Sequence, residues 1–290
     1  MRLSDYTRAA IRSASQLPPD LRARHLHEQQ RYADLWRELL AGAHAAGELQ
    51  PGLDLGAARM LLLGALNWSS EWWNPGRGSL RAVVGTAQRL LSAGLAPGSD
   101  PTPPLGLTES VSTAAPAARG TRNRILDAAA VVVLNRQGYA GTRLVDIGAV
   151  AGLQTPAIYY YYYYYYYYFA SRDEVIEEVV QVGVRRTMSH VETALDALPV
   201  AGPDVRIAAA VRAHLEIGVR DADYAAAAIQ NAGQLPGPIR RVRLLDQRRY
   251  AALWRGLLAS AADAGLLASG LDIRSVRMLV IGALNSAPGW

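Results

Sequence analysis

Behind Thr121, the apolar residues of the chain recur with the period of an α-helix. The run that begins at Ile125 predicts an amphipathic helix over residues 122–137, which Gly138 ends. A second, shorter helix is expected over residues 142–151, where apolar positions again repeat at helical spacing. Two short helices separated by a glycine are the first part of a helix-turn-helix.

The second of these helices leads through a turn into a third. Val145, Ile147 and Val150 are expected to face inward, and Gly152 provides the backbone freedom that a tight turn between two helices needs. The third helix is expected to open near Pro156, because proline in a first helical turn loses no hydrogen bond. Its small and polar side chains suit contact with DNA bases.

Ten consecutive tyrosines occupy positions 159–168, between the expected core residues Ile158 and Phe169. A helical insert of about seven residues would keep the facing of Phe169 but move it roughly 10 Å along the helix axis. Phe169 would then leave the core that Ile125 and Ile147 form. Three explanations stay open: a repeat expansion or sequence error without function, a tolerated helix extension, and a surface on which bases stack.

The chain also contains an internal repeat with a constant offset of 218 residues, as from Tyr6 to Tyr224. The repeated pairs are residues 5–6 and 223–224, 32–37 and 250–255, and 59–67 and 277–285. A match of this length indicates a tandem duplication and not the period of a solenoid. We call residues 1–72 the first repeat and residues 219–290 the second repeat.

Both repeats have an all-helical pattern that is punctuated by proline and glycine. The expected helices are 5–16, 19–46 and 54–68, their counterparts 223–234, 238–264 and 272–285, and a helix over 79–93. Residues 96–118 are rich in Pro, Gly, Ser and Thr and predict a flexible linker. No helix-turn-helix precedes the first repeat, so the chain is expected to be a window from a longer tandem protein.

The helix-turn-helix carries several short motifs in a fixed order. They are Gly138-Tyr139, Thr142-Arg143-Leu144-Val145-Asp146-Ile147, Ala151-Gly152-Leu153, Ala157-Ile158-Tyr159-Tyr160 and Phe169-Ala170-Ser171-Arg172. Together they resemble the DNA-binding domain of the TetR family of transcriptional repressors. The resemblance implies phosphate contacts from Thr142, Tyr159, Tyr160 and Arg172, and base or groove contacts from Arg143, Gln154, Thr155, Pro156 and Ala157.

We therefore expect an all-α protein with a TetR-like head and helical effector-binding and dimerisation domains in two copies. The expected domains are 1–95 (first effector domain, without a head of its own), 96–118 (linker), 119–172 (head with the tyrosine insertion) and 173–290 (second effector domain, without its last helix). The two effector domains should pair, within a chain or between chains, through helices that contain residues 60–68 and 278–285.

A cluster of tryptophans near Asn67 has two readings that stay open: packing in a core or dimer interface, and the mouth of an apolar effector pocket. The candidate ligand-binding residues are Trp36, Asn67, Trp68, Trp72, Trp254 and Asn285. Residues 64–75 also resemble the branch of the family that responds to acyl-CoA thioesters. That resemblance implies an acyl-CoA as the effector.

Composition limits the classes of function. The chain has 290 residues, half of them apolar, which allows about two domains with a sizeable core. Absence of cysteine excludes disulfides and cysteine chemistry and fits a reducing cytoplasm. The net charge of +5 comes from arginine without lysine and suits a polyanion such as double-stranded DNA. The apolar runs are too short to span a bilayer, and Asp5 and Arg8 argue against a signal peptide.

Catalysis and metal binding find no support, because His25 and His27 cannot share a helical face and the other histidines are isolated. We expect no enzyme, no cofactor and no metal site. The expected function is a sequence-specific DNA-binding regulator, a repressor, that reads a palindromic operator as a homodimer or intrachain pseudo-dimer and responds to a small apolar effector. The alternative is a helical protein that binds ligand or dimerises without DNA, its head disabled by the tyrosines. Correct folding of residues 122–172 would distinguish the two.

Overall fold

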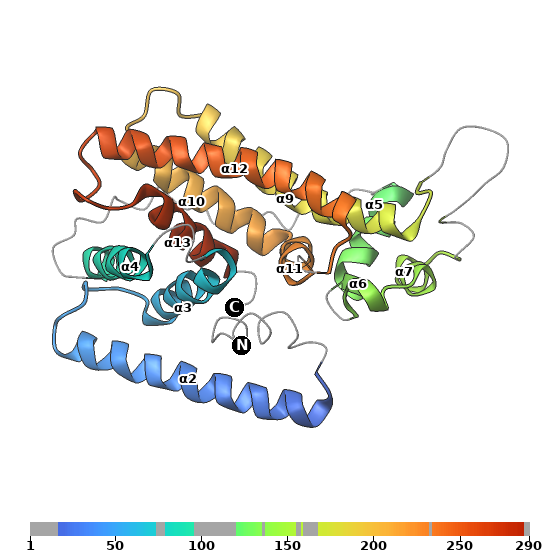
Figure 1. The fold of residues 1–290 in the computed structure, drawn as a ribbon, viewed down its shortest axis with the longest axis horizontal. Helices are drawn as coiled ribbons and strands as arrows, with labels where there is room; N and C mark the ends of the chain where they lie inside the picture. The colour runs from blue at the N-terminus through green and yellow to red at the C-terminus, as the bar shows by residue number, and fades with distance from the viewer. Residues whose placement is uncertain are drawn as a thin grey trace.

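The computed structural model describes residues 17–73, 79–95, 120–134, 137–154, 158, 168–231 and 234–286. These residues form helices and contain no strand, so the fold is all-α (Figure 1). The helices are α2 (Pro19–Ala45), α3 (Leu55–Trp72), α4 (Leu80–Leu95), α5 (Thr121–Ala128), the π-helix η3 (Ala129–Leu134), α6 (Gly138–Gly141), α7 (Leu144–Ala151), α9 (Arg172–Asp196), α10 (Pro203–Arg220), α11 (Ala222–Gln230), α12 (Gly237–Asp263) and α13 (Ile273–Ser286). In that part of the chain, no helix has the length and apolar character needed to cross a membrane.

The long helices α9, α10 and α12 pack on one another and form one layer of the molecule (Figure 1). The short helices α5, α6 and α7 form a head at one end of this layer, against the start of α9. Helices α13, α3 and α4 form a second layer, and α2 runs along its outer edge. The expected linker, residues 96–118, and the expected helix 5–16 lie outside the described residues.

The first helix of the head differs from the expected single helix over 122–137. It is α-helical only as far as Ala128 and continues as the π-helix η3, where Ala129 and Ala130 are fully buried. Helix α11 packs directly on this π-helical segment. Gly138 then adopts a φ of +66°, in the left-handed region that favours glycine, as expected of the residue that ends the helix.

Helix α7 is present, but two of the three residues expected to face inward are exposed. Val145 and Val150 are 52% and 47% exposed, and only Ile147 of the expected three is buried. The buried positions are Leu144, Ile147, Gly148 and Ala151. Their spacing of i, i+3, i+4 and i+7 is that of one face of an α-helix, and the other two valines fall outside it. Gly152 ends α7 with a φ of +66°, as the expected turn requires.

The two repeats fold locally in the same way. Helices α2 and α12 each have 27 residues, and their bounds differ by the repeat offset. Arg59 donates a hydrogen bond to the carbonyl oxygen of Ala33, and Arg277 donates one to that of Ala251, its counterpart. Each repeat therefore forms the same contact between its long helix and the helix that follows.

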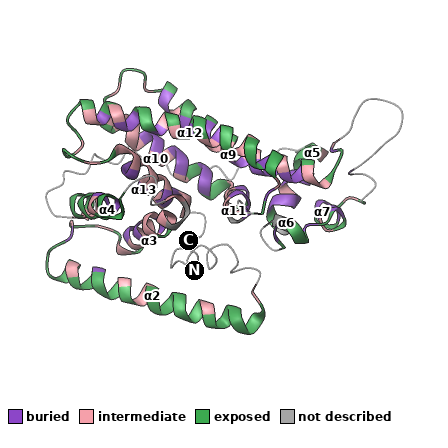
Figure 2. Ribbon diagram, viewed as in Figure 1, coloured by how far each residue is buried: buried purple, intermediate pink, exposed green. Residues whose placement is uncertain are grey.

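The surroundings of the two long helices differ. Tyr250, Trp254 and Leu257 of α12 are buried in one core cluster with residues of α9 and α10. Their counterparts on α2 include Tyr32 and Leu39, which are 47% and 57% exposed. Figure 2 shows α2 as almost entirely exposed, whereas α12 is buried along the face that meets its neighbours. This apolar face is therefore covered by α9 and α10 in the case of α12. Among the described residues, no helix covers the equivalent face of α2 in the same way.

Helices α3 and α13, one from each repeat, make the most extensive helix contact of the described residues. A methyl group on Gly282 would lie 2.5 Å from the Cβ atom of Trp68, and one on Gly64 would overlap the hydroxyl of Ser286. Gly64 corresponds to Gly282 at the repeat offset, and Trp68 corresponds to Ser286. The contact is therefore reciprocal, as across a twofold axis. The expected pairing of these two helices is present within one chain.

Candidate functional site

The candidate DNA-contacting residues that the structure describes differ in how accessible they are. The side chain of Arg143 is 71% exposed and pairs with Asp146, with Nε 2.8 Å from Oδ2. This ion pair lowers the pKa of Asp146. Gln154 is exposed directly after the Gly152 turn. Thr155, Pro156, Ala157, Tyr159 and Tyr160 lie outside the described residues.

Two other candidates use their polar atoms inside the head. Thr142 is 1% exposed, and its hydroxyl donates a hydrogen bond of 2.7 Å to the carbonyl oxygen of Gly138. Arg172 lies over the ring of Tyr139, 4.7 Å from its centroid, and pairs with Asp173 at 2.9 Å. In this arrangement both residues shape the head, and their contact with phosphate stays a prediction.

The displacement of Phe169 that a helical insert would cause is not present in the structure. Phe169 is 1% exposed and Ile158 is fully buried, and both lie in one core cluster with Ile125 and Ile147. Burying a phenylalanine stabilises a fold by about 1.5–3 kcal/mol, whereas lengthening the connection between two fixed points by seven residues costs only about 1 kcal/mol. Burial therefore prevails, and a helix extension that carries Phe169 out of the core is excluded.

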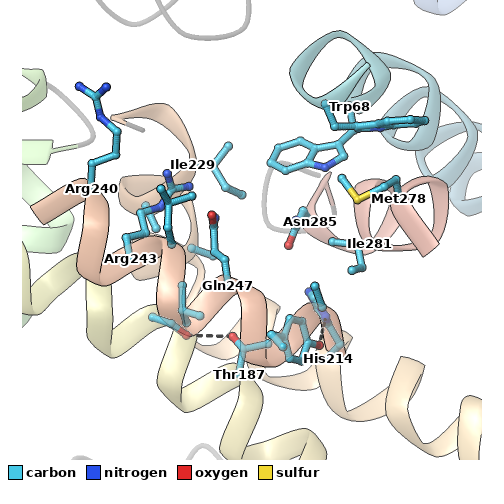
Figure 3. Close-up of a pocket in the computed structure, with 18 residues that line it drawn as sticks. Trp68, Thr187, His214, Ile229, Arg240, Arg243, Gln247, Met278, Ile281 and Asn285 are labelled. Carbon is cyan, nitrogen blue, oxygen red and sulfur yellow. Dashed lines mark hydrogen bonds between the residues drawn. The ribbon is translucent and has the colours of Figure 1, made fainter. Parts of the chain in front are cut away.

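A cavity of about 440 Å³ lies between the two layers of helices. It is lined by Gly183, Val184 and Thr187 of α9, His214 of α10, Ala225, Ala228 and Ile229 of α11, Arg240, Arg243, Leu244, Gln247, Tyr250 and Ala251 of α12, Met278, Ile281 and Asn285 of α13, and Trp68 and Trp72 of α3. Figure 3 shows Trp68, Ile281 and Asn285 facing Arg243 and Gln247 across this space. The size and the largely apolar wall suit a small organic ligand.

A buried polar pair lies in the wall of the cavity. Nδ1 of His214 is 2.7 Å from the hydroxyl oxygen of Tyr250, and His214 is 4% exposed. Burial lowers the pKa of His214 to about 4, although a hydrogen bond with Asn285 acts in the opposite direction. Burial also raises the pKa of Tyr250. Both side chains are therefore uncharged at neutral pH, and the pair suits an uncharged polar group of a ligand.

The charged residues of the wall all have the same sign. Arg240 and Arg243 line the cavity from α12, and no aspartate or glutamate is among the lining residues. Arg240 donates a hydrogen bond of 2.9 Å to the backbone carbonyl of Leu235, which holds it in place. Two guanidinium groups in one wall favour an anionic group on the ligand.

The candidate ligand residues separate into two groups. Trp68, Trp72 and Asn285 line the cavity, whereas Trp36, Asn67 and Trp254 do not. Trp254 is fully buried in the core between α9, α10 and α12. Over the described residues, no group of three or more histidine, aspartate or glutamate side chains is arranged to hold a metal ion.

The head and the cavity share two helices. Val175, Ile176, Val179 and Val180 at the start of α9 belong to the core of the head, and Gly183, one turn later, lines the cavity. Ala228 of α11 belongs to the head's core and also lines the cavity. A ligand in the cavity would therefore touch the same helices that support the head.

A match to the model of a known protein family identifies the family of this chain. The family model described as "Tetracyclin repressor-like, C-terminal domain" matches residues 1–95 and 201–290, which is more than half of the chain. The chain belongs to the TetR family. A search of curated proteins found no match.

Solved structures show the TetR fold at low sequence identity. A TetR-family transcriptional regulator from Bordetella parapertussis 12822 is 23% identical with a TM-score of 0.50, over 59% of this chain and 84% of that chain. The ketosteroid transcriptional regulator KstR2 of Mycobacterium tuberculosis is 18% identical with a TM-score of 0.52, over 60% of this chain and 84% of that chain. AibR, in complex with isovaleryl coenzyme A and operator DNA, is 18% identical with a TM-score of 0.50, over 59% and 86%.

Sequence reasoning missed most of the polar wall in this TetR-family chain. Arg240, Gln247 and Tyr250 were not among the candidate ligand residues. A signal for them exists, because each has an identical counterpart at the repeat offset, at Arg22, Gln29 and Tyr32. His214 has no such signal, since it lies outside the repeated segments.

Proposed function

We propose that this TetR-family protein is a transcriptional repressor that binds operator DNA through its helix-turn-helix head and is controlled by an effector in the cavity. The observation that carries the proposal is the shared position of Ala228, which belongs both to the head's core and to the cavity wall. An effector needs such a shared element, because it acts only through contacts that differ between the DNA-binding and released states.

Two hydrogen bonds join the effector domain to the head beside this shared element. The hydroxyl of Tyr224 on α11 donates a bond of 2.7 Å to Asp127 of α5. The backbone N–H of Tyr139 in the head donates a bond of 2.9 Å to the side chain of Asn231, just after α11. An effector that displaces α11 would pull on both bonds and so turn the head relative to α9.

The effector in this proposal is an apolar molecule with an anionic end, and an acyl-CoA thioester is the candidate. The apolar wall suits an acyl chain, and Arg240 and Arg243 suit the phosphates that follow it. A cavity of about 440 Å³ encloses the acyl part and leaves most of the coenzyme outside. AibR, which has a similar fold, was crystallised with isovaleryl coenzyme A and operator DNA.

The closed core of the head favours this proposal over a protein that binds ligand without DNA. Ile158 and Phe169, on either side of the tyrosines, are buried together. The exposed Arg143 directly precedes α7, and the exposed Gln154 follows the Gly152 turn that leads into the expected third helix. The head thus keeps the frame on which a reading helix depends, in spite of the insertion.

The test is selection of a binding sequence from random double-stranded DNA by the full chain, followed by titration at fixed salt. We expect a palindromic site, at least about tenfold weaker binding by Arg143→Ala or Thr155→Glu, and weaker binding in decanoyl-CoA. Arg31→Ala, which removes a 68% exposed arginine from α2, is the matched control and should bind normally. Failure to enrich any sequence, or full affinity in both head variants, would exclude the proposal.

A further inference from the structure

Trp68 belongs to the first repeat and lines the cavity of the second. It extends from α3, which packs on α13, and its Cβ atom lies against Gly282. Trp72 follows one helical turn later and lines the same cavity, so both rings share one face of α3. The wall formed by α9 to α13 is therefore completed by a helix that ends at Trp72, far before the start of α9 at Arg172.

The indole N–H of Trp72 is a buried polar group on the same face of α3. Its nitrogen is buried and has no hydrogen-bond partner among the described residues. A buried donor without an acceptor is destabilising, so this side chain has reason to change its position when the cavity is filled. Helix α3 thus offers a ligand the apolar surface of two indole rings.

The contact between the repeats is reciprocal in position but unequal in size. Gly282 meets Trp68, whereas the equivalent Gly64 meets the small side chain of Ser286. The large ring therefore occurs on the side of the contact where the cavity lies. In the first repeat, Tyr32 corresponds to Tyr250 of the cavity wall, yet it is 47% exposed on α2. Within the described residues, the first repeat contributes a lid to this cavity and its own equivalent wall is open.

We infer that the first repeat is a built-in partner whose α3 closes the effector cavity of the second repeat. The inference rests on the proposed role of that cavity and adds its regulation: ligand binding and the packing of α3 on α13 stabilise each other. Such coupling is reciprocal by thermodynamic necessity. Because the lid and the cavity belong to one chain, closure does not depend on protein concentration.

A single-thiol experiment tests closure without any ligand. The chain contains no cysteine, so Ala228→Cys places one thiol in the cavity wall, at a position that is 5% exposed. We expect a thiol reagent such as 5,5′-dithiobis(2-nitrobenzoate) to react slowly with this protein. Adding Trp68→Ala should accelerate the reaction at least about tenfold, because the lid is then shortened.

A second variant acts on the lid from outside the cavity. Gly64→Val wedges α3 away from α13 at Ser286 and should also accelerate the reaction. Gly42→Val is the matched control, because a methyl group on Gly42 would meet no described atom within 4 Å. Helical circular dichroism is recorded for every variant. If either well-folded lid variant reacts at the rate of the parent, the inferred lid is wrong.

The same thiol separates this inference from the proposed function. Decanoyl-CoA is the probe, and it should protect the thiol of the parent at least about fivefold and protect the Trp68→Ala variant less. Lid variants that react fast in a protein that decanoyl-CoA does not protect would uphold the lid and contradict the proposed effector. Equal protection of parent and lid variants would uphold the effector site and overturn the coupling.

Discussion

The hydroxyl of Tyr224 donates a hydrogen bond of 2.7 Å to the carboxylate of Asp127, and so connects α11 to α5 of the head. Burial raises the pKa of Tyr224, and so does the nearby carboxylate. The hydroxyl therefore stays protonated, and remains a donor, throughout the physiological pH range. Arg186 lies over the same ring, 4.8 Å from its centroid, on the side of α9.

Replacing Tyr224 by phenylalanine should weaken the connection between effector domain and head. We expect a loss of about 1 kcal/mol in the free energy of unfolding and a smaller change of operator affinity on adding decanoyl-CoA. Urea unfolding and DNA titration measure the two effects. Tyr32→Phe on the exposed face of α2 is the control. An undiminished effector response in Tyr224→Phe would show that the signal takes another route.

The two equivalent tryptophans should contribute very differently to stability. Trp254 is fully buried between α9, α10 and α12, whereas its counterpart Trp36 lies on the largely exposed face of α2. Trp254→Ala should lower the free energy of unfolding by about 3–5 kcal/mol, and Trp36→Ala by less than about 1.5 kcal/mol. Thermal and urea melts compare them directly. Similar losses would mean that the face of α2 is covered in solution.

Shortening the tyrosine run should change stability little. Ile158 and Phe169 already meet in the head's core, so deleting seven tyrosines leaves that core unchanged. A shorter connection loses less entropy on folding, which predicts a gain of about 1 kcal/mol. The melting temperature of the full chain with and without the deletion measures this. A gain of 3 kcal/mol or more, about the value of burying a whole phenylalanine, would contradict the position of Phe169.

Acid should destabilise the protein through His214. Its pKa is about 4 in the folded chain against an ordinary 6.5, so the unfolded chain takes up the proton first as the pH falls. The stabilising contribution is complete above pH 6.5 and is lost as the pH falls toward 4. Between pH 7 and pH 5 the loss should be about 2 kcal/mol. Urea midpoints should show this slope in the parent and in His44→Gln, and a much smaller one in His214→Gln.

The bounds of α2 and α12 could be predicted from the sequence because they follow local chemistry. Gly47 and Gly265, just beyond α2 and α12, both adopt a φ of +73°, and proline opens both helices. The buried face of α7 could not be placed, because valine is apolar on either face and only the neighbours decide which positions are covered. Val145 shows this, since Leu144 takes the inward position.

The cavity could not be predicted, because its position depends on contacts between distant segments that a single sequence does not show. Trp68 was a candidate ligand-binding residue. Because it is far from α12 in the sequence, the sequence could not show that it faces Arg243 and Gln247. His214 carries no local pattern, and its role follows only from burial beside Tyr250. Side chains that meet through long-range packing of helices leave little trace in spacing.

In an assembly of two identical subunits, every substitution at a twofold contact appears on both sides at once. The contact between α3 and α13 is encoded by two separate stretches of one gene, and a change at one side leaves the other untouched. A bulky ring at Trp68 and a small hydroxyl at Ser286 can therefore occupy matching positions. Because α3 and α13 can change independently, this chain can have different side chains on the two sides of the contact. A symmetric homodimer cannot.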